Sequence, residues 1–534
     1  MEILRKSSPP IALFGRRGFL TGAGATLLYS ALAPFGASRV ASAQQLGDYP
    51  FTLGVASGDP TATGVVLWTR LAPRPLEGGG MPGHPIAVQW QVATDERMER
   101  IVQRGAVLAV PELGHSVHVE VEGLDPSRWY WYRFRVGPEA SPIGRTRTAP
   151  AAGSLEALTF AFVSCQHYAQ GLYYAHKHLA EENLDFAVHL GDYIYEGRTT
   201  TSAVGRLHLP DHEITSIDDY RIRHAQYRSD PYLQAVHARF PWIVTWDDHE
   251  LENDYADMAP ENPADPADNQ PDFASRRARA YQVYYEHMPL RAAQVPTGPD
   301  MLLYRHLAFG ELLSMQVTDT RQYRSHRAPA TCLLAERVDG YCPSALDPTR
   351  TIAGATQDAW LVEGLMQSTA RWNLLANQVP FAPNDTNADP LVKTLGGEKW
   401  DGYPAGRQQV LDAIAARGLG NTIVITGDVH VNFVRNVPPN HVALDADPIA
   451  TEFIGTSISS GGDRTLATTY GGNANNPHLR FQDNHHGYVR CTVTPQLWRS
   501  DYRVVPSVVQ ADDGGVSTLA SFVVEEGKAG AQQI

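Results

Sequence analysis

The sequence predicts an α/β protein in which an all-β domain precedes a larger domain of alternating strands and helices. Between Phe51 and about Pro150, apolar and polar residues alternate in short runs separated by Gly, Pro and Asp. This alternation is typical of antiparallel strands with one buried face. After residue 153, apolar runs of strand length are interleaved with segments of helical spacing, which favours a largely parallel sheet. We therefore expect domains at 44–150 and 151–534, in a chain whose 534 residues suffice for roughly two to four domains.

Composition and charge place the chain among globular proteins. It holds 44 Lys and Arg against 58 Asp and Glu, with 43% hydrophobic residues. These proportions exclude a disordered chain, a collagen and a coiled coil. The formal net charge of −14 repels phosphate backbones, so no nucleic-acid surface is expected, and a phosphorylated substrate would need local cations.

Residues 1–43 have the composition of an export signal. They hold five basic residues and one acidic residue, an apolar run around Leu20 to Leu32, and the small residues Ala41-Ser42-Ala43. This order predicts a signal peptide that is cut after Ala43. Because the apolar run is shorter than the about 20 residues of a spanning helix, a permanent membrane anchor is the weaker interpretation.

The segment Arg16-Arg17-Gly18-Phe19-Leu20 resembles the twin-arginine export signature. The alternative is an ordinary signal peptide with a chance pair of arginines. Twin-arginine export carries proteins that have already folded, often with a metal or cofactor loaded. We therefore expect a periplasmic or secreted protein with the twin-arginine translocation machinery as a partner. Removal of a segment with net charge +4 from a chain of −14 leaves −18.

Four cysteines are few for an exported chain, so a disulfide framework does not hold the fold together. Cys332 and Cys342 enclose a short polar loop, and a disulfide between them would stabilise the fold by roughly 2–3 kcal/mol, although the sequence leaves the pairing open. Cys491 lies in an alternating strand pattern and is expected in the core. Cys165 is left unpaired.

Within the N-terminal domain, Leu124-Asp125-Pro126 followed by Tyr130-Trp131-Tyr132 resembles the tyrosine corner of fibronectin type III sandwiches. In that corner a phenol ties a strand end to upstream backbone. We therefore interpret these aromatic residues as structural. The alternative is a surface on which carbohydrates stack.

The larger domain begins with a strand, a helix and a second strand, which is the pattern of a βαβ unit. Its predicted strands lie at 158–164, 184–190, 243–246, 312–318 and 422–426. Its predicted helices lie at 171–182, 274–287 and 357–368, and a long loop is expected at 252–273. In such a fold, ligands gather outside the carboxyl ends of the strands.

Four segments at strand ends are dense in groups that bind metals. They are Ser164-Cys165-Gln166, Gly191-Asp192-Tyr193-Ile194-Tyr195, Trp246-Asp247-Asp248-His249-Glu250 and Gly427-Asp428-Val429-His430. Each segment alone has an ordinary explanation, such as a helix cap or a solvated loop. Together they would bring carboxylates, imidazoles, a thiol and a phenol to one edge of a sheet. Only a metal centre compensates for the desolvation of so many anionic groups in one place.

These segments also resemble a known family. Gly-Asp-x-x-Tyr at 191–195, carboxylate-His-Glu at 248–250 and Gly-x-x-His at 427–430 are similar to the metallophosphoesterase motifs in their purple-acid-phosphatase variant. The closer resemblance is to the PhoD-like alkaline phosphatase/phosphodiesterase family, from about Phe51 to the C-terminus. It also rests on segments 51–60, 189–196, 319–324 and 426–430. The resemblance implies a metallophosphoesterase-type β-sandwich flanked by helices and preceded by the fibronectin-III-like domain.

The chain departs from the general metallophosphoesterase pattern in the way that PhoD-like proteins do. Cys165 stands where Asp-x-His is usual at the first strand, and Gly-Asp-Val-His replaces Gly-His-x-His. One imidazole is thereby lost, and a thiolate and a carboxylate are gained. That donor set disfavours two transition metals and suits one iron with one or more hard cations.

Donor chemistry assigns the ligands. A thiolate and a phenolate favour Fe3+, so Cys165, Tyr195 and His430 with Asp192 form the expected iron site. Oxygen donors suit Ca2+. The expected calcium site comprises Asp192 as a bridge, Asp248, Asp428 and Asn377. The family is known for iron with calcium, which agrees with this assignment. Asp247 and Asn253 could serve a further calcium or only loop structure, and Glu250 is undecided.

The resemblance and the donor set imply hydrolysis of phosphomonoesters, phosphodiesters or both by a metal-activated hydroxide. His249 is the expected general acid or donor to the leaving oxygen. Arg321 would grip phosphate oxygens through its planar fork, with Arg324 as the reserve; the alternative for Arg321 is a salt bridge to Asp319.

Two rival functions stay open at this point. One is an exported phospholipase D-type phosphodiesterase acting on lipid headgroups with the same metals. The other is an exported binding protein that presents aromatic residues to cell-wall glycans and has a purely structural metal cluster. The expected partners are accordingly small phosphate esters or cell-wall and lipid phosphodiesters.

Overall fold

The computed structural model describes residues 48–262, 272–327, 332–387, 389, 391–418, 420–463, 475–511 and 513–534. Residues 45–534 form one compact unit. The predicted signal peptide at 1–43 lies outside the described residues. No helix in the described ranges is both long and apolar enough to cross a membrane.

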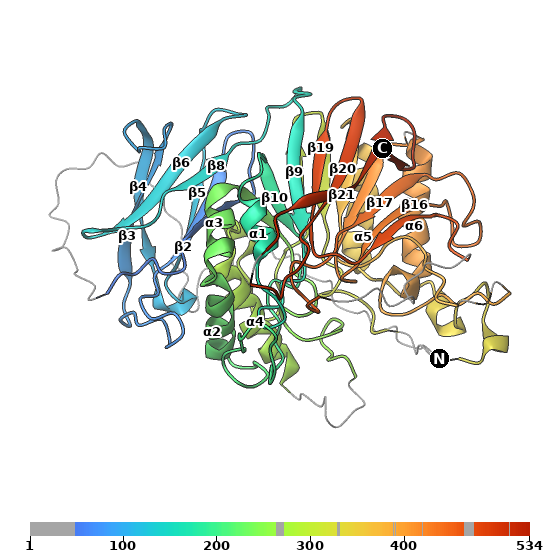
Figure 1. Cartoon of the computed structure of the whole chain (residues 1–534), viewed down its shortest axis with the longest axis horizontal. Helices are drawn as coiled ribbons and strands as arrows, with labels where there is room; N and C mark the ends of the chain where they lie inside the picture. The colour runs from blue at the N-terminus through green and yellow to red at the C-terminus, as the bar shows by residue number, and fades with distance from the viewer. Residues whose placement is uncertain are drawn as a thin grey trace, which may run out of the picture. The chain divides into compact units, whose positions relative to one another are not determined.

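Strands dominate the fold (Figure 1). The strands of the first 150 residues are β1 (Val55–Gly58), β2 (Val65–Arg70), β3 (Ile86–Ala93), β4 (Ile101–Ala109), β5 (Ser116–Val121), β6 (Trp129–Val136), β7 (Glu139–Ala140) and β8 (Gly144–Arg147). The following strands are β9 (Leu158–Val163), β10 (Phe186–His189), β11 (Pro241–Val244), β12 (Arg305–Phe309), β13 (Leu313–Val317), β14 (Trp372–Ala376) and β15 (Thr422–Thr426). The last ones are β16 (Asn432–Val437), β17 (Ala450–Ile454), β18 (Leu479–Asp483), β19 (Gly487–Val493), β20 (Leu497–Val504), β21 (Ser517–Glu525) and β22 (Gln532–Gln533). The α-helices are α1 (Tyr174–Leu179), α2 (Ile217–Arg228), α3 (Pro231–Arg239), α4 (Phe273–His287), α5 (Ala355–Gln367) and α6 (Pro404–Arg417).

Two large sheets form the centre of the fold. A ten-stranded sheet has the order β22-β21-β20-β19-β9-β10-β11-β1-β2-β5, and a seven-stranded sheet has the order β12-β13-β14-β15-β17-β16-β18. Strands β9, β10 and β11 run parallel, as do β13, β14, β15 and β17. The parallel pair β9 and β10, joined through α1, confirms the predicted βαβ unit.

The main core lies between these two sheets, which confirms the expected sandwich. Phe160 and Phe186 stack at 4.8 Å in the ten-stranded sheet, and Phe309 of the other sheet stacks on Phe186 at 4.5 Å. Each fully buried side chain of this size stabilises the fold by about 1.5–3 kcal/mol relative to exposure.

Helices cover the two outer faces of the sandwich. Helices α1 to α4 pack on the ten-stranded sheet, where Tyr281 of α4 stacks on Trp246 at 4.1 Å. Helices α5 and α6 pack on the seven-stranded sheet, through Leu361 and Val410 among others. The order of layers is therefore helix, sheet, sheet, helix.

The N-terminal β region is a second, smaller sandwich. A five-stranded sheet of β3, β4 and β6 to β8 encloses a core with β1, β2 and β5, which belong to the ten-stranded sheet. The predicted tyrosine corner is present, because the Asp125 backbone N–H donates to the Tyr130 hydroxyl at 2.8 Å. Since β1 also pairs in parallel with β11, the sheet runs across residue 150, and the domain division there stays a prediction.

Most predicted elements of the larger domain agree with the structure within a few residues. Helices α2 and α3 were not predicted, because charged residues face several sides of them. The available signal was the capping box of α2. In it, the Asp219 N–H donates to the Ser216 hydroxyl at 3.2 Å, and the Asp219 carboxylate accepts the Ser216 N–H at 3.0 Å.

Cysteine expectations are met. Cys332 and Cys342 form a disulfide with a Cα–Cα distance of 5.8 Å. Cys491 is buried in β19 without a disulfide partner, and Cys165 is a free buried thiol. Of the long loop expected at 252–273, residues 252–262 lie in turns and bends, and α4 begins at Phe273.

Candidate metal centre

The proposed ligands follow the carboxyl ends of parallel strands, as the sequence predicted, but these strands belong to two sheets and not to one. Cys165 follows β9, Asp192 and Tyr195 follow β10, Asp247 to His249 follow β11, Asn377 follows β14, and Asp428 and His430 follow β15. The segments after the strands approach one another closely at two glycines. A Cβ atom on Gly191 would lie 2.4 Å from the Asp247 backbone nitrogen, and one on Gly427 would lie 2.6 Å from the Ser164 hydroxyl of the other sheet. No other residue fits at these contacts.

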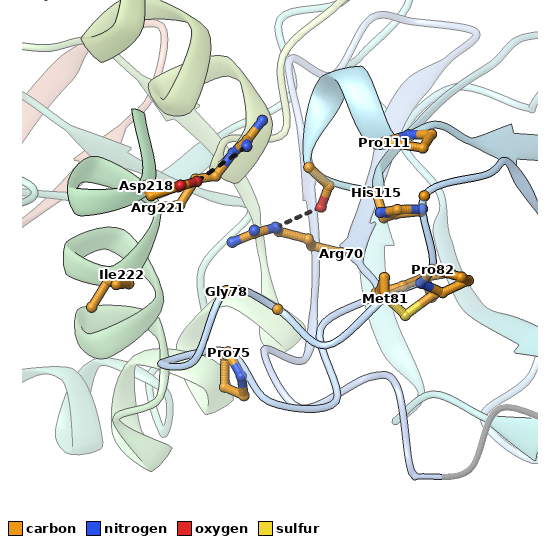
Figure 2. A pocket seen from close by; sticks show the side chains of 14 residues that line it. Arg70, Pro75, Gly78, Met81, Pro82, Pro111, His115, Asp218, Arg221 and Ile222 are labelled. Carbon is orange, nitrogen blue, oxygen red and sulfur yellow. Dashed lines mark hydrogen bonds and ion pairs between the residues drawn. The ribbon is translucent and has the colours of Figure 1, made fainter. Parts of the chain in front are cut away.

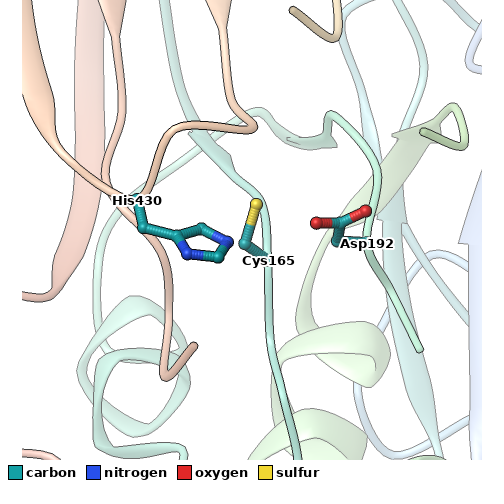
Figure 3. Close-up of side chains that lie close together, drawn as sticks. All are labelled: Cys165, Asp192 and His430. Carbon is teal, nitrogen blue, oxygen red and sulfur yellow. The ribbon is translucent and has the colours of Figure 1, made fainter. Parts of the chain in front are cut away.

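Three of the four expected iron ligands converge. One donor atom each of Cys165, Asp192 and His430 lies within 4.8 Å of the other two (Figure 3). Thiol, carboxylate and imidazole come from three separate chain segments.

Tyr195 completes the group. Its hydroxyl donates to the Asp192 carboxylate at 2.9 Å and lies 3.1 Å from Nε2 of His430. The Ser460 hydroxyl donates to the Tyr195 oxygen at 2.7 Å. The thiol, carboxylate, imidazole and phenol that the sequence predicted for iron thus lie together.

Unusual backbone conformations hold these ligands. Four of the eleven non-glycine residues with positive φ in the described ranges are proposed ligands: Cys165 (60°), Asp192 (56°), Asp428 (68°) and His430 (56°). Each such conformation costs of the order of 1 kcal/mol or more for a residue with a Cβ atom. Strain collected at four positions after the three strands β9, β10 and β15 points to a functional site.

Electrostatics favour a cation at this position. Burial raises the pKa of Asp192 well above its usual range, and Asp248 and Asp247 raise it further against the effect of His249. Burial and then Asp192 likewise raise the pKa values of Cys165 and Tyr195. Oδ1 of Asp192 is buried and has no hydrogen-bond partner among the described residues. A donor set of this kind fits a metal ion, because a cation supplies the charge that the protein does not.

A second group shares Asp192. Donor atoms of Asp192, Asp248 and His249 lie within 4.8 Å of one another. Asp428, expected in the calcium site, is linked to Asp248 through Arg321, whose Nη2 is 3.5 Å from Asp248 and 3.9 Å from Asp428. The ammonium group of Lys399 also contacts the Asp428 carboxylate.

Asn377 lies at the expected strand end, but its side chain is engaged elsewhere. Its amide oxygen accepts from the Trp400 indole at 3.1 Å, and its amide nitrogen donates to the Val379 carbonyl. Its place in the calcium site remains a prediction.

Arg321 is fully buried among carboxylates. Its Nε donates to Asp247 at 2.5 Å and its Nη1 to Asp254 at 3.3 Å. The alternative of a salt bridge to Asp319 is wrong, because Asp319 accepts the backbone N–H groups of Arg321 and Gln322 at 3.0 Å instead. Although burial opposes it, Asp247 and Asp248 hold the pKa of Arg321 well above its usual range. The grip on phosphate stays a prediction, as does the reserve role of Arg324, whose guanidinium donates to the Glu398 carbonyl at 2.6 Å.

His249 is oriented by a carboxylate that the sequence analysis did not single out. Its Nδ1 lies 2.7 Å from Oε2 of Glu196, whose other oxygen accepts the Asn253 backbone N–H at 2.8 Å. Burial opposes the charged imidazole, yet Glu196 and Asp192 raise the pKa of His249 well above its usual range. The signal for Glu196 was its place at the end of the His189–Glu196 motif. Asn253 directs its side-chain amide to Glu261 at 3.0 Å, so a role for it in a further calcium site stays a prediction.

Glu250, undecided from sequence, supports the backbone of the site. Its carboxylate accepts N–H groups of Asp192 at 3.2 Å, Tyr193 at 2.6 Å and Asp247 at 2.9 Å. Burial raises its pKa to about 8. Glu250 thereby connects the segments that follow β10 and β11.

Tyr193 points away from the proposed ligands. Its hydroxyl lies 2.9 Å from the His237 ring and accepts from Arg228 at 3.1 Å. The neighbouring tyrosines of the motif therefore have different environments. Ser460 and Lys399 had no signal in the sequence, because each lies in an irregular loop far along the chain from its partner.

This fold and site define a class. A helix-flanked two-sheet sandwich with metal-type ligands at its strand ends is the arrangement of the metallophosphoesterases. A solved structure of purple acid phosphatase from yellow lupin has the same fold, with a TM-score of 0.54 and 12% identity over 90% of this chain and 74% of that one.

The particular family is shown by closer relatives. The model of the PhoD-like phosphatase family matches residues 160–502, and that of the PhoD-like phosphatase N-terminal domain matches residues 37–150. Alkaline phosphatase D of Bacillus subtilis (strain 168) is 47% identical over 549 aligned positions, covering 100% of this chain and 91% of that protein. A solved structure of PhoD matches with a TM-score of 0.85 and 46% identity over 92% of this chain and 93% of that one. The chain belongs to the PhoD-like phosphatase family and is a phosphoric ester hydrolase.

Proposed function

We propose that this phosphatase is exported and hydrolyses phosphomonoesters, phosphodiesters or both at a centre of Fe3+ and Ca2+. The observation that carries the proposal is the convergence of Cys165, Asp192 and His430 within 4.8 Å, with the Tyr195 hydroxyl 2.9 Å from Asp192. No other common metal suits a joint thiolate and phenolate set as well as ferric iron.

Iron would be held by Cys165, Tyr195, His430 and Asp192. Calcium would be held by the carboxylates of Asp192, Asp248 and Asp428, together with the Asn377 amide oxygen, since hard cations prefer oxygen. These ions supply Lewis acidity toward the phosphate and lower the pKa of water at the site.

The chain's own residues would orient the metal ligands and donate a proton to the leaving oxygen. Glu196 accepts the Nδ1 proton of His249, so Nε2 is the nitrogen that can donate a proton to the leaving oxygen. Arg321 balances the charge of Asp247 and Asp248 inside the protein. Ser460 fixes the orientation of the Tyr195 phenol through its hydrogen bond.

The proposal includes export of the folded enzyme. Arg16 and Arg17 with the apolar run and the Ala41-Ser42-Ala43 sequence form a twin-arginine signal, and the mature protein begins at Gln44. Folding and metal loading would precede translocation to the periplasm or the outside. The partners are phosphate esters of small molecules or of the cell surface.

Two matched tyrosine variants test the iron assignment. Tyr195→Phe removes a phenolate, so it should shift or bleach a visible charge-transfer band and lower turnover. Tyr193→Phe is the control, because that hydroxyl bonds to His237 and Arg228 in the core. Cys165→Ala should lose iron outright. Equal spectra for both tyrosine variants would contradict the assignment.

Assays of a monoester, a diester and phosphatidylcholine side by side decide the substrate class. Release of the headgroup alcohol from phosphatidylcholine as the fastest reaction would favour the phospholipase D-type alternative. Full metal loading with no hydrolysis of any ester would favour the glycan-binding alternative.

A further inference from the structure

A cavity of about 180 Å³ lies outside the proposed metal centre. It is bounded by the glycine-rich loop at 75–83, the turn that contains Gly114 and His115, and helix α2 (Figure 2). Its volume is several times the roughly 30 Å³ that one water molecule occupies in the liquid. None of its lining residues is a proposed metal ligand.

Arg70, at the end of β2, is the buried cation of this cavity. Its side chain is 3% exposed, and burial lowers its pKa to about 10. Its Nε donates to the Gly114 carbonyl at 2.8 Å, and its Nη1 lies 2.7 Å from Nε2 of His287. Because Nδ1 of His287 faces the Val283 carbonyl at 2.8 Å, the His287 ring carries its proton there and accepts from Arg70 as a neutral imidazole.

Both partners of Arg70 are therefore uncharged. A guanidinium has five N–H groups, and these two bonds use two of them. Nη2 has no hydrogen bond to any described residue, and it lies 3.8 Å from the position that a Cβ atom on Gly79 would take, so it faces the glycine loop. Arg70 forms no ion pair with a carboxylate of the described residues, which is unusual for a buried arginine. The Glu286 and Asp218 carboxylates are close enough to raise its pKa, but burial has the larger effect and lowers it.

The other charged groups at the cavity either have a partner within the protein or are exposed to solvent. Arg221 binds the buried Glu286 carboxylate through two hydrogen bonds of 2.8 and 2.7 Å. Asp218 has a side chain that is 75% exposed and lies 3.6 Å from Arg221. Burial lowers the pKa of His115, which leaves that ring neutral. The Glu286 and Asp218 carboxylates therefore form their ion pairs with Arg221 and act on the charge of Arg70 without contacting it.

We propose that this cavity binds a small oxyanion, whose oxygens accept the free N–H groups of Arg70. A planar guanidinium edge matches the paired oxygens of a carboxylate, sulfate or phosphate. The glycine loop allows such a ligand to approach, because Gly78 and Gly83 have no atom within 4 Å of the place of a side chain. The ligand would supply the direct contact with a negative charge that a buried arginine ordinarily makes within the protein.

Crystals of the metal-loaded enzyme soaked in selenate locate the anion directly through the anomalous signal of selenium. The expected result is a peak in the cavity with an oxygen about 2.8 Å from Nη2 of Arg70. Parallel soaks in phosphate and acetate decide between tetrahedral and carboxylate ligands. A cavity that holds only water at saturating selenate, phosphate and acetate would overturn the proposal.

Variants test the site in solution by equilibrium dialysis with radiolabelled sulfate at constant ionic strength. Asp218→Asn removes an exposed negative charge beside the cavity and should tighten binding about two- to threefold. Glu99→Gln, an exposed change of the same charge far along the chain, is the matched control and should change nothing. Arg70→Lys keeps the charge without the fork and should weaken binding roughly tenfold. If Arg70→Lys does not fold, Asp218→Asn against Glu99→Gln decides, and equal affinities of those two variants would contradict the site.

Discussion

Glu250 connects the two segments that carry most of the proposed ligands, and its replacement tests that connection. The carboxylate accepts three buried backbone N–H groups, from Asp192, Tyr193 and Asp247. Each buried N–H left unpaired costs about 1–3 kcal/mol. Glu250→Ala would therefore cost about 3–9 kcal/mol, a large part of the roughly 5–15 kcal/mol that keeps a typical protein folded.

Glu250→Gln is the informative variant because it keeps the shape. Oε2 accepts the N–H groups of Asp192 and Asp247, and Oε1 accepts that of Tyr193. A glutamine can retain its oxygen at the first position, but its NH2 group then faces the N–H of Tyr193. We expect a loss of about 1–3 kcal/mol in the free energy of unfolding. Replacing a residue that supports a metal ligand typically lowers metal affinity about 10- to 100-fold, so we expect iron affinity to fall by that factor.

Guanidinium unfolding, iron per chain and the visible spectrum of one sample measure these effects together. Asp230→Asn is the matched control: Asp230 is buried and accepts the N–H groups of Tyr232 and Leu233 at 2.9 and 3.2 Å, but it touches no proposed ligand. It should lower stability and keep iron. A Glu250→Gln protein with the iron content and stability of the wild type would show that Glu250 does not support the ligand segments.

Three further outcomes follow from the site and the signal. A calcium-selective chelator should abolish hydrolysis while iron stays bound, and added calcium should restore it; full activity of metal-free protein with zinc alone would contradict the oxygen-rich assignment. Arg321→Lys should lower turnover about 10- to 100-fold, since it breaks the contacts with Asp247 and Asp254, and unchanged kinetics would show that the fork is dispensable. Lysines at Arg16 and Arg17 should keep the precursor in the cytoplasm, whereas undiminished export or an N-terminus before Arg39 would exclude the proposed signal.

The fold was predictable wherever hydrophobic periodicity was strong. The buried strand at Thr422–Thr426 and helix α4 have such patterns, and their predicted bounds agree with the structure within about one residue. Helices α2 and α3 were missed because their stability comes from caps and from buried polar contacts such as that of Arg223 with the Tyr195 carbonyl. Hydrophobic periodicity does not predict such contacts.

For the site, the proposed metal ligands were predictable from the sequence, but the residues that hydrogen-bond to them were not. Cys165, Asp192 and His430 were predictable because parallel strands present ligands at their carboxyl ends, although the meeting of two sheets at this site was not predicted. The roles of Glu196 and Ser460 were not predictable, since they depend on which loop side chains meet, and loops have no periodic pattern. The place of Glu196 at the end of the His189–Glu196 motif was a signal only of its importance. Arg321 was found, but its burial among aspartates was not predictable. The sequence around an arginine after a strand is the same whether the side chain faces substrate or carboxylates.

The central claim is that a thiolate and a phenolate hold iron in an active phosphatase. Elemental analysis of the purified enzyme, with a visible spectrum and an ester-hydrolysis assay on the same sample, tests it most directly. We expect a coloured protein that contains iron and calcium and hydrolyses a phosphate ester. A colourless protein that is fully active and free of iron would contradict it.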